Sequence, residues 1–323
     1  MADPFTNTYL TYSAKGLRED LSNIISDISP EATPFQTGCG RVTAKATLVE
    51  WQTDTLAAAV STNVRVEGFD VTSVTAVTPT VRVGNYTNIS AKDFAIAGTL
   101  DAVDKAGRAS EKAYVMARKG AELKRDMEKM LLDNVGGNAG ASTTTARQTA
   151  TLGAWVKTNT SKGSGGGDPA YTSGVPSAAR TDGTTRTFTE AVLTTVLSSV
   201  WTQGGNAKIL SVNSTEKALV SAFAGVVTKN YNIADRPRPT AIIASADVYV
   251  GQFDTVSIVP NRFQRDRDGW ILDYDYLDIA VLRPFQEVPL ARTGDAEKAM
   301  ILTEYALVVR NEKALGLCAD LGG

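Results

Sequence analysis

Three aspartates in the C-terminal part of the chain come closest to the spacing of a catalytic or metal site: Asp273, Asp275 and Asp278. Closely spaced carboxylates can hold calcium or magnesium. On a strand, Asp273 and Asp275 would share one face, but no glycine turn or distal glutamate completes a calcium loop. The spacing therefore favours polar positions at a strand edge, and we expect neither metal nor cofactor. A carboxylate-dependent enzyme using Asp273 and Asp275 is the remaining catalytic alternative.

Histidine and cysteine usage narrows the chemistry further. The chain of 323 residues contains no histidine, which removes the commonest general base near neutral pH and the commonest transition-metal ligand. Cys39 and Cys318 are its two cysteines. They are too few for a disulfide framework and lack the spacing of a zinc site, so we expect packing residues. No residue is predicted to be catalytic, and enzyme function is disfavoured.

Two further motifs invite a comparison with phosphate sites, and the sequence argues against both. The glycine cluster within residues 163–167 is followed by neither the lysine and serine/threonine pair nor the helix of a phosphate-binding loop. This favours a flexible surface loop. The run from Arg262 to Asp268 alternates positive and negative charges, which favours a solvated loop or salt bridges between subunits.

Bulk properties indicate an ordinary folded protein. Hydrophobic residues make up 43% of the chain and charged residues 21%, as in soluble domains. No secretion signal and no run of about 18 apolar residues is recognisable, so we expect synthesis in a cytoplasm and no membrane contact. The net charge of -2 supplies no positive field, and any contact with DNA should be weak and independent of sequence.

Residues 45–90 are predicted to form a long two-stranded arm that cannot bury a core of its own. The apolar residues of its two strands alternate with polar ones, the period of a pleated strand: Ala46, Leu48 and Trp51 outbound, and Val77, Val81 and Val83 on the return. Between them runs a tip from Asp54 to Asp70. Ordering this ribbon costs on the order of 50 kcal/mol, which corresponds to roughly 2,000 Å² of apolar burial. A neighbouring subunit could supply that cover; the alternative is an ordinary hairpin folded against its own domain.

We expect specific residues of the arm to contact the neighbour. Burial is predicted for Trp51, Val64, Phe69 and Val81, and electrostatic registration for Arg65, Glu67 and Asp70.

The N-terminal segment, residues 1–44, is predicted to be a second arm. It carries three aromatic anchors for assembly: Phe5, Tyr9 and Tyr12. Leucine and isoleucine then recur at helical spacing at positions 17, 21, 24 and 28. This short helix packs either on its own domain or on another subunit, and the extended polar run before it favours exchange between subunits.

A long amphipathic helix is predicted over residues 109–134. Its apolar seam has spacings of three and four: Ala113, Met116, Gly120, Leu123, Met127 and Met130. Gly136 and Gly137 end it. Such a charged helix usually covers a core with its outer face in water; the alternative is direct contact between subunits.

The remaining chain divides by composition. Residues 136–185 are rich in Gly, Ser and Thr, which makes them the best domain boundary. A second domain of helices and strands follows over residues 187–285, opening with a capping box formed by Thr187 and Glu190. Residues 90–106 are expected to be helical or irregular, and the segment from Met300 to Leu317 to form paired strands with a turn at 311–313. The fold class is α+β.

The order of these parts, and four short runs, resemble the major capsid protein of tailed bacteriophages, whose fold is shared with encapsulins and the herpesvirus capsid floor. The runs are VEWQTDTL (49–56), ELKRDME (122–128), SIVPNRF (257–263) and EYALVVRNEKA (304–314). The resemblance implies that residues 45–90 are an extension loop lying over an adjacent subunit. It also implies a peripheral domain (residues 91–186 and 286–323) with spine helix 109–134, and an axial domain over residues 187–285.

The same resemblance implies a structural protein of the virion. Copies would self-assemble in the host bacterial cytoplasm into hexamers and pentamers of an icosahedral head enclosing double-stranded DNA. A separate scaffolding protein, a portal and decoration proteins are the implied partners besides the protein itself. The alternatives are an encapsulin-like compartment shell or another virion component, such as a tail-tube or decoration protein.

Overall fold

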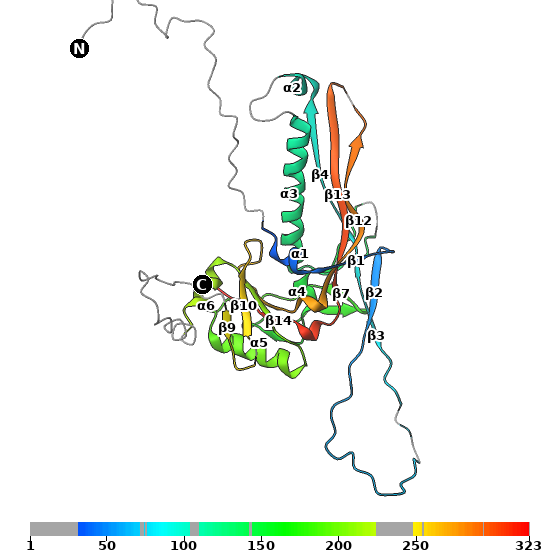
Figure 1. Cartoon of the computed structure of the whole chain (residues 1–323), viewed down its shortest axis with the longest axis vertical. Coiled ribbons are helices and arrows are strands. Elements are labelled where there is room, and N and C mark those ends of the chain that lie inside the picture. Colours follow the sequence, from blue (N-terminus) through cyan, green and yellow to red (C-terminus); the bar gives the residue numbers. More distant parts are fainter. Residues whose placement is uncertain are drawn as a thin grey trace, which may run out of the picture.

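The computed structural model describes residues 32–71, 74, 76–103, 110–141, 144–223, 248–253, 255–292 and 294–322. Figure 1 shows a long part built from a narrow sheet and one helix, beside whose base lies a broader α/β part. The chain between β2 and β3 projects away from both. The N-terminal aromatic residues Phe5, Tyr9 and Tyr12 lie outside the described residues.

The long part is a four-stranded sheet covered by α3 (Glu111–Leu131). Its strand order is β1 (Gly40–Thr43), β12 (Leu277–Leu290), β13 (Ala296–Val309) and β4 (Asn88–Ala97). β1 runs parallel to β12, and the other neighbours are antiparallel. α3 lies along β4 and β13 over much of their length (Figure 1).

The broader part contains a six-stranded sheet with two helices. The strand order is β5 (Thr160–Ser161), β14 (Gly316–Cys318), β11 (Gly269–Leu272), β8 (Ile209–Val212), β10 (Thr255–Pro260) and β9 (Val248–Val250). α5 (Glu190–Thr202) packs on β14 and β5, and α6 (Ser214–Ser221) on β10. Buried side chains of α5, such as Leu193 and Val196, meet Leu210 and Val212 of β8 in one apolar core.

Shorter elements complete the described structure. They are the helices α1 (Pro34–Gly38), α2 (Gly98–Ala102) and α4 (Leu152–Trp155), the 3-10 turns η1 (Tyr274–Tyr276) and η2 (Glu312–Ala314), and the hairpins β2 (Leu48–Thr53) with β3 (Val81–Tyr86) and β6 (Ala170–Thr172) with β7 (Val175–Ala178).

The end of β13 is apolar on both faces because it lies between two cores. Tyr305, Leu307 and Val309 enter the main core, whereas Ala306 and Val308 enter a smaller core on the other face. Successive strand residues point to opposite faces, so a continuous apolar run is what a strand covered on both sides requires.

The predicted long helix is confirmed as α3. It begins after Ser110, whose hydroxyl accepts a hydrogen bond from the Ala113 N–H at 3.3 Å and so caps one free backbone donor. Leu123, Met127 and Leu131 form its buried seam. The seam is buried only toward the C-terminal end of the helix, since Met116 and Gly120 are half-buried and Ala113 is exposed.

Glu128, on the same helix, joins three parts of the chain. Its buried carboxylate accepts hydrogen bonds from the backbone N–H groups of Phe35 (2.8 Å) and Gln36 (2.9 Å) and from the Asn261 side chain (2.7 Å). These contacts fix α1 and the start of the 261–268 loop against α3. Burial raises the pKa of Glu128 above its usual value, and the donated hydrogen bonds oppose that rise.

Three local expectations were wrong. Residues 90–97 belong to strand β4, because pairing with β13 along ten positions overrides their weak local pattern. The capping box at Thr187 is absent: α5 begins at Glu190 after Thr189, and the Glu190 carboxylate instead accepts from the Tyr249 hydroxyl at 2.9 Å. The strands on either side of residues 311–313 do not pair with each other, since β13 and β14 lie in different sheets.

The observed strands also cross the expected division between residues 285 and 286. β12 runs unbroken from Leu277 to Leu290. β14, expected in the peripheral domain, lies in the six-stranded sheet between β5 and β11. The chain therefore returns to the broader part at its C-terminal end.

Candidate assembly interface

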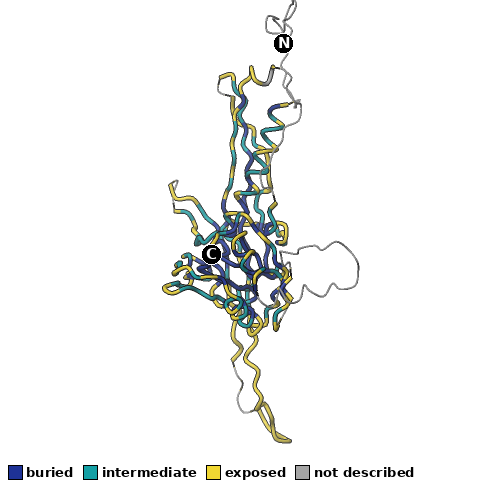
Figure 2. The backbone as a smooth tube through the Cα atoms, turned by 90° about the vertical axis from the view of Figure 1, so that its left-hand side faces the viewer, coloured by how far each residue is buried: buried dark blue, intermediate teal, exposed yellow. Residues whose placement is uncertain are grey.

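Residues 54–80, the exposed segment of the extension loop, connect β2 to β3 and form no strand where they are described. The segment is coloured as exposed in Figure 2. Its apolar residues include Leu56, which is 99% exposed, Val64 (82%), Val77 (92%) and Phe69 (48%). Single exposed apolar residues are ordinary, but a long run of them marks a surface for another protein. The described residues of the chain leave this segment uncovered.

The root of the loop, in contrast, is fixed in the core. The indole N–H of Trp51 donates to the Val309 carbonyl at 3.0 Å, and its ring lies 5.4 Å from that of Trp155. Asn85 is fully buried, and its amide donates to the carbonyls of Ala150 (2.9 Å) and Leu307 (2.7 Å). The β2–β3 ladder between these anchors holds the exposed segment away from the body of the subunit.

The predicted interface residues separate into two groups. Val64, Arg65, Glu67, Phe69, Asp70 and Val81 are exposed. The Arg65 guanidinium lies 5.4 Å from the centre of the Phe69 ring, an arrangement that shields one face of the ring. Trp51 differs, because its side chain is half-buried by its own chain. It supports the loop from inside the subunit.

Several exposed apolar residues of the segment were missed by the sequence reasoning. They are Leu56, Val60, Val66, Val71, Val74 and, outside the strand in which it was expected, Val77. The signal was present, since valine recurs through residues 60–77 without the polar alternation of a half-buried strand. The predicted hairpin is confirmed only over β2 and β3.

A buried ion network lies beneath the predicted glycine loop. The Asp320 carboxylate accepts hydrogen bonds from the N–H groups of Gly163 (3.0 Å) and Gly183 (2.8 Å) and from Arg267 (3.0 Å). A Cβ on Gly163 would come within 2.0 Å of the Thr184 carbonyl oxygen. Gly163 therefore permits close backbone packing around a carboxylate, while Ser164 and Gly165 are exposed as expected of a surface loop.

The charged loop 262–268 belongs to the same network. Arg265 pairs with Asp182, and Asp268, fully buried, pairs with Arg180. These are contacts within one chain, so the expectation of a solvated loop or intersubunit salt bridges was wrong for these two residues. Alternating charges in a sequence indicate a solvated face only when the fold leaves those residues exposed to water. Here Arg180 and Asp182 pack against Asp268 and Arg265.

Asp268 predicts a pH dependence of stability. Burial raises its pKa to about 6, against the opposing effect of Arg180 and Arg265. An unfolded aspartate ionises near pH 3.9, so the folded state binds more protons between these values. The free energy of unfolding contributed by Asp268 should fall by on the order of 1 to 3 kcal/mol as pH rises from 4 to 6, and stay level above it.

The measurement is urea unfolding of unassembled subunits between pH 4 and pH 7, comparing the protein with Asp268→Asn. The difference in free energy of unfolding between the two should decline across this range. A difference that is constant with pH would show that Asp268 ionises normally.

The three aspartates considered for metal binding are paired with cations. Asp273 accepts from the Lys208 ammonium group at 3.1 Å, Asp275 pairs with the same lysine, and Asp278 with Arg310. Among the described residues no group of three or more potential metal ligands comes together. The described helices include none with the length and apolarity of a membrane span. Cys39 and Cys318 are both buried, as predicted.

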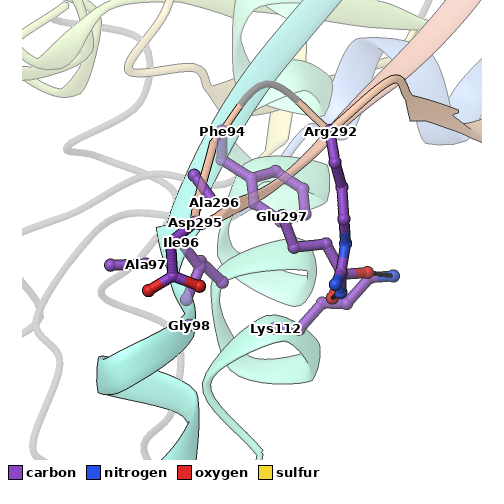
Figure 3. Close-up of a pocket in the computed structure, with 9 residues that line it drawn as sticks. All are labelled: Phe94, Ile96, Ala97, Gly98, Lys112, Arg292, Asp295, Ala296 and Glu297. Carbon is purple, nitrogen blue, oxygen red and sulfur yellow. Dashed lines mark hydrogen bonds and ion pairs between the residues drawn. The ribbon is translucent and has the colours of Figure 1, made fainter.

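A pocket at the far end of the long part is also lined by paired charges. Figure 3 shows Lys112 and Arg292 converging on Glu297, beside Phe94 and Ile96. The Lys112 ammonium lies 2.6 Å from Glu297 and 3.3 Å from Glu287. Because Lys112 and Arg292 are both paired with glutamates of the same chain, the pocket has the character of a structural junction between α3 and the β12–β13 turn.

Comparison with known proteins agrees with the geometry. The model of the SU10 major capsid protein family matches residues 4–322. The chain is similar to the major capsid protein of Escherichia phage Phieco32, with 28% identity over 363 aligned positions that cover 100% of this chain and 99% of that protein.

Solved structures share the fold at low sequence identity. The capsid asymmetric unit of cyanophage A-1(L) superposes with a TM-score of 0.69 at 14% identity, covering 96% of this chain and 98% of that one. A structure from Gordonia phage Cozz gives 0.59 at 12% identity, with 95% and 92% covered. The SrpI encapsulin of Synechococcus elongatus gives 0.55 at 9% identity, with 94% and 92% covered. The chain belongs to the SU10 major capsid protein family and is a structural, non-enzymatic component of the virion that forms the shell of a phage head.

Proposed function

We propose that the exposed segment of the extension loop joins subunits by lying over the peripheral part of a neighbouring copy. The observation that supports this is a run of exposed apolar side chains above a root anchored in the core. In an isolated subunit this surface faces water, and a neighbouring copy would remove it from water at about 25 cal/mol per Å². Arg65, Glu67 and Asp70 set the register by charge.

Other parts of the chain contribute to the same shell. Phe5, Tyr9 and Tyr12 of the N-terminal arm add aromatic anchors at the interface. Residues 187–285 gather around the five-fold and six-fold axes of pentamers and hexamers, and the long part forms the peripheral domain of an icosahedral head around double-stranded DNA. Each subunit makes modest contacts to several neighbours, and closure of the shell multiplies them.

The net charge of -2 suits a shell whose inner wall contacts DNA weakly and without sequence specificity. Assembly of the head involves a separate scaffolding protein, a portal and decoration proteins, and it takes place in the host bacterial cytoplasm. Expression of the chain with and without a candidate scaffold, followed by electron microscopy, tests this arrangement.

A double substitution tests the loop itself. In Val64→Ser/Phe69→Ser, both side chains are exposed in the subunit, so folding should be unchanged within about 0.5 kcal/mol. Assembly should weaken by about 3 kcal/mol or more per subunit, because burial of each apolar side chain contributes about 1.5 to 3 kcal/mol. Light scattering and electron microscopy would then detect free subunits or small rings at concentrations at which the parent forms shells.

The matched control is Ser61→Ala/Thr62→Ala, two exposed positions in the same segment whose replacement removes two hydroxyl groups and no more apolar surface than one methyl group. Its shells should form normally. If the serine variant also forms normal shells at the parent's concentration, the segment does not join subunits.

A further inference from the structure

An open groove runs along α3 where the helix faces β12 and β13. It has a volume of about 470 Å³. Met116, Ala117, Gly120 and Ala121 of α3 line one side, and Phe285 and Ile301 line the other. Thr33, Lys124, Gln286 and Glu287 complete the lining. Phe285 remains 37% exposed in it. The apolar seam of α3 therefore continues past its buried end into a space that the described residues leave open.

Gly120 is the clearest sign that something occupies this groove. A Cβ placed on it would meet no described atom within 4 Å outside the helix itself, so no close packing within the described chain explains a glycine there. Glycine in a helix interior lowers helix stability relative to alanine. With Ala117 and Ala121 beside it, Gly120 would let another backbone approach α3 closely.

The N-terminal end of the described chain lies at one end of the groove. Thr33 lines it, and α1, which follows, is tied to α3 by the hydrogen bond from the Gln36 side chain to the Lys124 carbonyl (2.6 Å) and by the two backbone donors to Glu128. The ion pair of Lys112 with Glu287, a residue that lines the groove, lies toward its other end. The residues before Thr33 thus leave the body at the mouth of the groove.

We propose that residues 17–28 of the same chain fill this groove as a helix parallel to α3. Its predicted apolar stripe, Leu17, Leu21, Ile24 and Ile28, would face the seam. Twelve helical residues span about 18 Å, the distance that α3 covers between residues 112 and 124. The four residues from 29 to 32 bridge Ile28 to Thr33, and Pro30 among them ends the helix.

This occupancy differs from the exchange between subunits that the polar N-terminal run favours. The physical reason is the position of Thr33, because the arm reaches its own groove without crossing to another copy. The aromatic residues Phe5, Tyr9 and Tyr12 then emerge beyond the far end of α3, where they remain available to a neighbour.

A disulfide crosslink in the full-length chain tests the proposal. The parallel register brings Leu21 opposite Ala117, so Leu21→Cys/Ala117→Cys should form a disulfide within one chain on mild oxidation of unassembled subunits. Cys39 and Cys318 are buried and stay reduced. Intact mass spectrometry without reductant, followed by peptide mapping, should show a single-chain mass and a linked 21–117 peptide.

The matched control is Asn23→Cys/Ala117→Cys. Two residues along a helix rotate a side chain by about 200°, so this cysteine points away from α3 and should crosslink about fivefold less. Equal crosslinking of both pairs, or none for the Leu21 pair, overturns the proposal. Covalent dimers in place of linked single chains would show that the occupant comes from a second copy.

A second variant narrows the groove without touching the arm. Gly120→Leu has room in the subunit, because no described atom outside the helix lies near its Cβ, and it should displace the arm. Gly120→Ala adds a single methyl group and should displace it less. Trypsin should then cut after Arg18, the only basic residue within positions 17–28, about tenfold faster than in the parent. Unchanged cleavage of a folded Gly120→Leu subunit contradicts the proposal.

Discussion

Replacing residues 55–79 with a short glycine–serine linker should produce a folded subunit that does not close into shells. The replaced residues include the exposed apolar side chains of the loop, from Leu56 to Val77. Their burial on a neighbour would contribute on the order of 10 kcal/mol per subunit, most of the free energy available to a modest interface. Without it the remaining contacts cannot hold a closed particle.

The bounds of this replacement follow from the structure. A deletion from Ala46 to Ile89 would also remove Trp51 and Asn85, whose hydrogen bonds enter the main core. Such a variant would fail to fold and would say nothing about assembly. The shorter replacement keeps β2 and β3 intact, so the two effects can be separated.

The measurement is size-exclusion chromatography with light scattering, electron microscopy, and thermal unfolding of the subunit. We expect single subunits or small rings whose circular dichroism spectrum equals that of the parent chain. Closed shells of normal size from the linker variant would show that the exposed segment is dispensable for assembly.

Replacing Asp320 with alanine should destabilise the subunit by about 3 to 5 kcal/mol, the usual cost of removing one partner from a buried charge network. Asp320 is fully buried, and its carboxylate is the shared acceptor for Gly163, Gly183 and Arg267. Its loss would leave the Gly163 and Gly183 N–H groups without this acceptor and would remove one of the partners of Arg267, which also donates to the Gly183 carbonyl. Asp320 also has φ of 59°, a left-handed conformation that alanine adopts less readily than aspartate or asparagine.

The substitution should be made in the linker variant, which is expected to remain unassembled. Urea unfolding then measures the free energy of unfolding of the isolated subunit. Asp320→Asn should lose less stability than Asp320→Ala, since it keeps the shape and one acceptor. Asp168→Ala is the surface control: Asp168 pairs with Lys162 at 2.5 Å but is partly exposed, so its loss should cost no more than about 1 kcal/mol. If Asp320→Ala and Asp168→Ala unfold at the same urea concentration, the network does not stabilise the fold.

The strand and helix patterns of this chain could be read locally, and so could the resemblance to capsid proteins. The alternation that ends in Val81 and Val83 predicted the return strand β3, and the spacing of Leu123 and Met127 predicted the seam of α3. These signals span a few residues, because the periods of strand and helix are properties of neighbouring positions. The valines that recur through residues 60–77 likewise indicate a surface that another protein covers.

The long-range partners could not be read in the same way. Nothing near Asp320 in sequence identifies Gly163 and Gly183 as its donors, and nothing near Glu128 identifies Phe35 and Gln36. Residues 90–97 became a strand only because β13 offered a continuous partner. By itself the sequence determined the α+β class, the paired strands β2 and β3, the long helix α3 and the family. Only the tertiary structure decided which glycines cradle a buried carboxylate, which sheet receives β14, and where α3 is left open, because each depends on contacts between segments far apart in the chain.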